Sequence, residues 1–112
     1  MTGTSELDRF GRHVVVIGGC GHVGLPLAIA FAGRGARVGI YDVSESSVEM
    51  VNAGRMPFAE PGATEVLGQV VAAGLLEAST DPAIVSSAEH VVVVIGTPVA
   101  DIWNMLGQGV QI

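Results

Sequence analysis

The stretch HVVVIGGCGHVG, residues 13–24, decides the fold of this 112-residue chain. It begins with a continuous apolar run, Val14 to Ile17, and such a run without alternation is typical of a strand buried on both faces of a parallel sheet. Glycines at positions 18, 19, 21 and 24 end that strand. Residues 23–32 are apolar on nearly every side, which predicts a helix packed closely against the sheet.

Outside this stretch the chain continues to alternate between strand and helix signals. Further strands are predicted at residues 37–42, 75–79 and 91–95, the last one fully buried. Helices are predicted up to residue 53, at 63–73 and from Pro82 onward. Ser46 and Glu49 have capping-box spacing in the first of these, and Asp81 and Pro82 read as the N-cap and first residue of the last. The alternation predicts an α/β fold, a Rossmann-type doubly wound parallel sheet that 112 residues leave incomplete.

The glycines form the pattern G-x-G-x-x-G, with Gly19, Gly21 and Gly24 at the fixed positions. Between a strand and a helix, this pattern permits a tight turn, lets a pyrophosphate approach the backbone, and lets helix and strand pack closely. Gly18, Gly21 and Gly24 also fit G-x-x-G-x-x-G, the spacing of short-chain dehydrogenases and sugar-nucleotide epimerases. The spacing does not choose between the two registers, and both predict a bound dinucleotide. Glycines at such a junction also arise from packing alone.

Asp42 ends the second predicted strand, about 20 residues beyond Gly21. A carboxylate at this place hydrogen-bonds the hydroxyl groups of the adenosine ribose and disfavours a 2′-phosphate, so NAD is favoured over NADP. The alternative interpretation of Asp42 is a turn residue at the strand end or a helix N-cap.

Composition excludes several classes of function. The net charge is −6 and the chain contains no lysine, so a basic surface for nucleic acid or for a membrane is absent. One cysteine, Cys20, allows neither an internal disulfide nor a cysteine metal cluster, and we expect no metal and a cytoplasmic location. Cys20 is predicted to be an inert loop residue, and His22 a residue that packs in the loop or lies beside the phosphates.

Four segments together resemble the N-terminal NAD-binding domain of the UDP-glucose/GDP-mannose dehydrogenase family. Within that family they are most similar to the UDP-N-acetyl-mannosamine dehydrogenases. The four segments are VVVIGGCGHVGLPLAIAFA, Tyr41-Asp42-Val43, NAGRMPFAEPG and VVVVIGTPV. The resemblance covers residues 13–99 and favours the first glycine register. Ala63 and Ser47 depart from the family pattern, as does the stretch after Val99.

The resemblance implies a set of cofactor-binding residues. They are Gly19, Cys20, Gly21, His22, Val23 and Gly24 around the pyrophosphate, Asp42 at the adenine ribose, and Thr97 at the end of its strand. It also implies that Glu60 lies near the cofactor cleft, although Glu60 and Arg55 are equally well explained as loop-stabilising charges.

The resemblance also implies that cofactor binding and catalysis are carried by different domains. In that family a nucleotide-sugar alcohol is oxidised to the acid with two NAD, through a thiohemiacetal on a cysteine of a later domain. We therefore expect no catalytic residue here. Residues 1–12 would be a flexible leader, and residues 13–112 the N-terminal part of a dinucleotide-binding domain without its substrate and catalytic domain. The expected partners of the full-length parent are NAD, a UDP-sugar and other copies in a homo-oligomer.

Two other functions stay open at this point. One is a stand-alone module that senses or binds NAD, and the other is a fragment of a sugar-nucleotide epimerase or dehydratase. A Tyr-x-x-x-Lys motif downstream would favour the epimerase, whereas the Glu-Pro-Gly and Gly-Thr-Pro segments favour the dehydrogenase.

Overall fold

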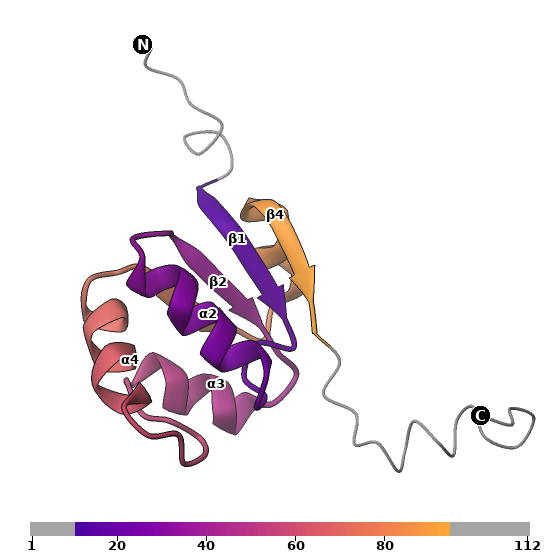
Figure 1. Ribbon diagram of the computed structural model, residues 1–112. Helices are drawn as coiled ribbons and strands as arrows, with labels where there is room; N and C mark the ends of the chain where they lie inside the picture. The colour runs from indigo at the N-terminus through magenta and orange to yellow at the C-terminus, as the bar shows by residue number, and fades with distance from the viewer. Residues whose placement is uncertain (1–10, 95–112) are drawn as a thin grey trace, which may run out of the picture.

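The computed structural model describes residues 11–94, which form a four-stranded parallel sheet with helices on both faces (Figure 1). In chain order the elements are β1 (Arg12–Ile17), α2 (Gly24–Gly33), β2 (Val38–Tyr41), α3 (Glu45–Asn52), α4 (Ala63–Ala72), β3 (Leu76–Ser79), the 3₁₀ helix η1 (Pro82–Ser87) and β4 (Ala88–Val93). The strands lie in the order β3-β2-β1-β4, which is the order of the first four strands of a Rossmann sheet. The predicted fold class is confirmed.

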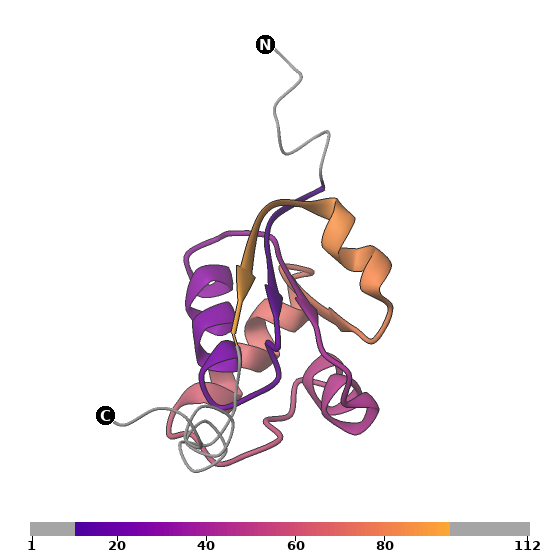
Figure 2. The ribbon, with the colours of Figure 1, turned by 90° about the vertical axis from the view of Figure 1, so that its right-hand side faces the viewer.

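The helices form two layers around the sheet. Helices α2 and α4 pack against each other on one face, and α3 lies beside β3. Helix η1 carries the chain from β3 to β4 across the opposite face, where it contacts β2 and β1 (Figure 2). This reversal after β3 is why the glycine turn, which follows the central strand β1, lies at the point where the two halves of the sheet diverge.

The core is almost entirely aliphatic. Val16 of β1 is paired with Ile40 of β2 on one side and with Val92 of β4 on the other. Val16 and Ile40 are completely buried under the helical layer, where Leu25 of α2 and Leu67 of α4 meet them in one cluster. The unbroken apolar run of β1 is thus explained by helices on one face and η1 on the other.

Two details of the predicted elements are wrong. Helix α3 is capped by Ser44, whose hydroxyl accepts from Ser47 N–H, and not by Ser46 in a capping box with Glu49. Helix η1 is a 3₁₀ turn, although Asp81 is its N-cap as predicted and accepts from Ala83 N–H. Ser44 and Ser46 are of the same residue type and both lie near the start of α3, so the residue type does not reveal which of them is the N-cap.

Strand β4 is neither as short nor as buried as predicted. It begins at Ala88 instead of residue 91, and Val91 and Val93 are 45% and 62% exposed. Within residues 11–94, β4 is paired on one side only, with β1. The other edge strand, β3, is protected, because the amide of Asn52 donates to Ala78 C=O and accepts from Ala78 N–H, both at 2.8 Å.

Candidate functional site

The candidate site is built where β1 and β2 end side by side. Ile17 is paired with Tyr41 at the last position of both strands, and Gly18 N–H donates to Tyr41 C=O at 2.8 Å. Gly18 then turns the chain with φ of +81°, and a side chain there would lie 2.2 Å from Val94 C=O. The turn brings residues 19–23 over the carboxyl ends of the strands, immediately before α2.

The three glycines of the fingerprint have different physical roles. A Cβ on Gly24 would lie 2.5 Å from Gly18 C=O, and one on Gly19 would lie 2.8 Å from Ile40 Cγ2. These two glycines are therefore required by the packing of the turn against the helix and the sheet. A Cβ on Gly21 would meet nothing closer than 3.6 Å, so the fold itself does not demand glycine there. The space at Gly21 leaves room for a ligand to approach the backbone, as the fingerprint predicts.

The start of α2 presents backbone N–H groups without a protein anion. Within the described residues no side chain caps this helix at Val23, and its first turn holds no acidic residue. Val23 is 65% exposed, so the turn is open to solvent. Leu25 N–H donates to Gly21 C=O, and Pro26 has no N–H. Val23 and Gly24 are therefore the residues whose N–H groups would meet a phosphate, together with the positive end of the helix dipole.

Asp42 lies directly against this turn. One carboxylate oxygen accepts from Cys20 N–H and the other from Ser44 N–H, each at 3.0 Å. Asp42 is therefore not the N-cap of α3, a position that Ser44 occupies. Each oxygen can accept a further hydrogen bond, so the carboxylate can hold the turn and still receive the two hydroxyls of a ribose.

Cys20 has no chemical role that its environment supports. Its side chain is 5% exposed, and burial, followed by the charge of Asp42, raises the pKa of the thiol to about 12. A thiol with this pKa carries almost no thiolate at neutral pH, and the thiolate is the reactive form. The burial of Cys20 supports the prediction that it is inert, which stays a prediction.

His22 makes a contact that the sequence did not reveal. Its exposed imidazole stacks on the ring of Phe58, with 4.1 Å between ring centroids and 23° between planes. Phe58 lies in the loop between α3 and α4 and also packs against the core. The aromatic residue inside the segment RMPFAEPG was the available signal, but no spacing rule relates it to His22.

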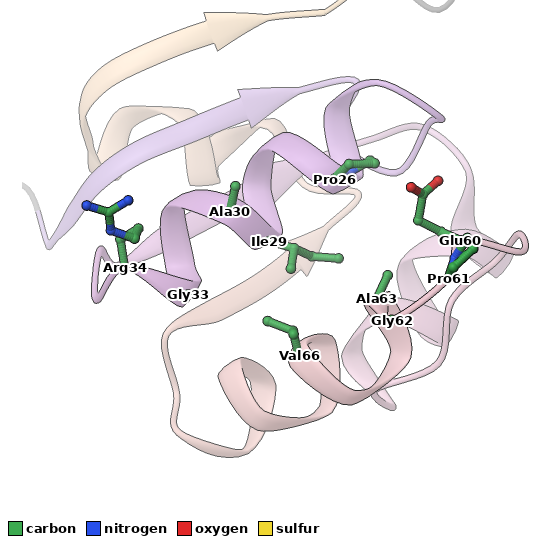
Figure 3. Close-up of a pocket in the computed structure, with 10 residues that line it drawn as sticks. All are labelled: Pro26, Ile29, Ala30, Gly33, Arg34, Glu60, Pro61, Gly62, Ala63 and Val66. Carbon is green, nitrogen blue, oxygen red and sulfur yellow. The ribbon is translucent and has the colours of Figure 1, made fainter.

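Glu60 lines a cavity between α2 and α4, and none of the residues 18–24 of the turn lines this cavity. The cavity has a volume of about 540 Å³, and its walls come from α2, from α4 and from the loop before α4 (Figure 3). Glu60 and Pro26 stand at one end and Arg34 at the other, with Ile29 between them. Because Pro26 is two residues beyond Gly24, the end of the cavity that contains Glu60 adjoins the start of α2. The place of Glu60 near the cofactor stays a prediction.

Two further features bound the site. Among residues 11–94 there is no cluster of three or more His, Cys, Asp or Glu that could hold a metal ion. In the same part of the chain no helix is long and apolar enough to cross a membrane. Thr97, the last predicted site residue, lies outside the described residues, as do residues 1–10 of the predicted leader.

A parallel sheet in Rossmann order, a G-x-G-x-x-G turn before an uncapped helix, and a carboxylate at the end of β2 define a dinucleotide-binding domain. The chain belongs to the UDP-glucose/GDP-mannose dehydrogenase family, because the family's NAD-binding domain model matches residues 12–105.

Known proteins of this family resemble the chain in sequence and in structure. It is 32% identical over 92 residues to the UDP-N-acetyl-D-mannosamine dehydrogenase of Campylobacter jejuni, covering 82% of this chain and 21% of that protein. It is 35% identical over 85 residues to the GDP-mannose 6-dehydrogenase of Azotobacter vinelandii, covering 75% of this chain and 20% of that protein. The chain thus spans about a fifth of the length of these relatives.

Solved structures of nucleotide-sugar dehydrogenases are also similar to this chain. The crystal structure of GDP-mannose dehydrogenase from Pseudomonas aeruginosa superposes with a TM-score of 0.73 at 31% identity, over 77% of this chain and 20% of that one. The UDP-glucose dehydrogenase of Pyrobaculum islandicum gives a TM-score of 0.71 at 35% identity, over 78% of this chain and 20% of that one. These matches favour the dehydrogenase over the epimerase fragment and over a stand-alone sensing module.

Proposed function

We propose that this chain is the cofactor-binding part of a cytoplasmic nucleotide-sugar dehydrogenase that oxidises the primary alcohol of a UDP-sugar to the uronic acid for polysaccharide biosynthesis. The proposal includes a homo-oligomeric parent protein. Relatives named for UDP-N-acetyl-D-mannosamine and for GDP-mannose support the reaction class. Overall, one alcohol and one water would give the acid while two NAD are reduced to two NADH.

The single observation that carries the proposal is the hydrogen bond between Asp42 and Cys20 N–H at 3.0 Å. The proposal is supported because this hydrogen bond joins Asp42 to the glycine turn, and one dinucleotide would have to contact both. Gly19, Gly21 and Gly24 would form the cradle for the pyrophosphate, and the backbone of Cys20, His22 and Val23 would line it.

Thr97 and Glu60 complete the proposed set of residues. Thr97 follows β4, the neighbour of β1, and residues after the carboxyl ends of parallel strands meet at one edge of the sheet. We propose that Thr97 approaches the cofactor there, while Glu60 acts from the loop before α4. The residues present fit NAD, which would supply the hydride acceptor. The chain's own share of the work is to bind and orient it.

The proposal predicts binding without turnover. Hydride transfer needs a substrate carbon held over the nicotinamide, and the covalent stage needs an activated thiolate beside that carbon. The chain's one thiol is buried in the phosphate turn, and the chain has no lysine. Pure 112-residue protein should therefore bind NAD yet produce no NADH, measured by absorbance, with UDP-glucose or UDP-N-acetylmannosamine.

The matched control is the Cys20→Ser variant. Turnover by the wild-type chain that disappears in this variant would show that Cys20 is a nucleophile, and would overturn the assignment of this chain as a cofactor-binding part. Absence of any NAD binding by the folded chain would overturn the proposed function itself.

A further inference from the structure

The stack between His22 and Phe58 joins two loops that are far apart in sequence. His22 occupies a variable position of the glycine turn, and Phe58 lies in the loop between α3 and α4. The two rings are not held equally firmly, because Phe58 packs against the buried cluster whereas His22 is exposed. Phe58 is thus the fixed member of the pair, and the side chain of His22 rests on it.

The rest of the turn is held from its two ends. At the first end Cys20 N–H donates to Asp42, and at the second Leu25 N–H donates to Gly21 C=O as α2 begins. Gly21 N–H reaches Gly18 C=O only at 3.4 Å, a long hydrogen bond. Val23 is 65% exposed and adds little packing. The stack therefore holds the middle of the turn, at the residue whose backbone follows Gly21.

We propose that Phe58 is a positioning residue for the cofactor, which acts by holding the backbone of His22 in the conformation that receives the pyrophosphate. The inference rests on the proposed function of the turn. Phe58 would touch the imidazole and not the cofactor. An aromatic pair of this geometry restrains a glycine-rich turn before binding, and affinity gained by such preorganisation comes from ordering that need not occur on binding.

The first arm of the test needs no cofactor. Amide hydrogen exchange of Cys20, Gly21 and Leu25, whose N–H groups are hydrogen-bonded, is compared in the wild-type chain and in three variants. The variants are Phe58→Leu, Phe58→Tyr and His22→Ala. Leucine retains apolar contact with the core but has no ring, whereas tyrosine keeps the ring. We expect faster exchange in Phe58→Leu and His22→Ala, and near wild-type exchange in Phe58→Tyr.

The second arm measures NAD affinity of the same proteins by titration calorimetry. We expect Phe58→Leu and His22→Ala to bind about three- to tenfold more weakly, the scale of one aromatic pair. Phe58→Tyr should restore the affinity, and His22→Phe should recover most of what His22→Ala loses. Phe31→Leu is the matched control, since Phe31 lies on α2, is 36% exposed, and should leave both measurements unchanged.

The outcomes are distinguishable. His22→Ala, which leaves the core intact, keeps the test valid if Phe58→Leu does not fold. Unchanged exchange and unchanged affinity in His22→Ala would overturn the inference. It would also be overturned if His22→Phe bound as weakly as His22→Ala, because the imidazole would then act on the cofactor directly. No NAD binding by the wild-type chain, with faster exchange in the variants, would overturn the proposed function and leave Phe58 as a structural residue of the turn.

Discussion

At the scale of single residues, Asp42 joins the end of β2 to the turn that we propose binds the cofactor. Its carboxylate accepts from Cys20 N–H and from Ser44 N–H, so it orders the turn before any ligand arrives. From its distance to the glycines, the sequence predicted a ribose role for Asp42, with a turn residue or an N-cap as the alternative; a hydrogen bond to the glycine turn was not predicted. This hydrogen bond follows from the pairing of β1 with β2, which no local pattern contains.

The Asp42→Ala substitution should therefore have two effects. NAD affinity should fall by about 1.5–3 kcal/mol, the value of charge-assisted hydrogen bonds to the ribose. The free energy of unfolding should also fall, because two backbone N–H groups lose their acceptor. Titration calorimetry and urea unfolding measure the two separately. Normal NAD affinity in a folded Asp42→Ala chain would exclude Asp42 from the cofactor site.

Cys20 gives a prediction about pH. Burial and the charge of Asp42 raise the pKa of the thiol from 9.0 to about 12, so between these values the folded chain keeps a proton that the unfolded chain has lost. Stability from this difference is fully present below pH 9 and is lost as the pH rises toward 12. Urea unfolding at several alkaline pH values should show this decline. The decline should be smaller in Cys20→Ser, and an equal decline in both proteins would contradict the assignment.

At the scale of elements, the junction of β1 and α2 contains one glycine that the fold requires and another that we expect only cofactor binding to require. Gly24 is required by contact with Gly18, whereas Gly21 has free space around it. Gly24→Ala should destabilise the chain by about 1–3 kcal/mol through overpacking. Gly21→Val should remain folded and lose NAD binding, because its side chain fills the space of the pyrophosphate. Urea unfolding and calorimetry test the pair, and a folded Gly21→Val that binds NAD normally would show that the glycines serve packing alone.

The order of the elements could be predicted from the sequence, but the cap of α3 and the exposure of the edge strand β4 could not. Apolar runs and glycines located β1 and α2 to within a residue, since burial on both faces and close packing leave clear patterns. The predicted N-cap of α3, Ser46, was wrong, because Ser44 and Ser46 are the same residue type and the sequence does not distinguish them. The exposure of Val91 and Val93 was missed, because a run of valines does not reveal whether a strand is central or at an edge.

At the scale of the whole molecule, the two edges of the sheet differ. Asn52 satisfies the backbone of Ala78 on the edge of β3, so that side of the sheet is closed to pairing. On the other side β4 leaves Val91 and Val93 exposed within the described part of the chain. Within residues 11–94 the outer edge of β3 is thus hydrogen-bonded at Ala78, whereas the outer edge of β4 pairs with no strand.

The central claim is that the turn at residues 19–24 and Asp42 together bind NAD and discriminate against NADP. The most direct test is titration calorimetry of the folded 112-residue chain with NAD and with NADP under identical conditions. A 2′-phosphate beside the Asp42 carboxylate would meet repulsion and replace the 2′-hydroxyl that the carboxylate accepts from. We therefore predict that NAD binds more tightly than NADP and that Asp42→Asn narrows the difference between the two affinities. Equal affinity for the two cofactors, or a preference for NADP, would contradict the account.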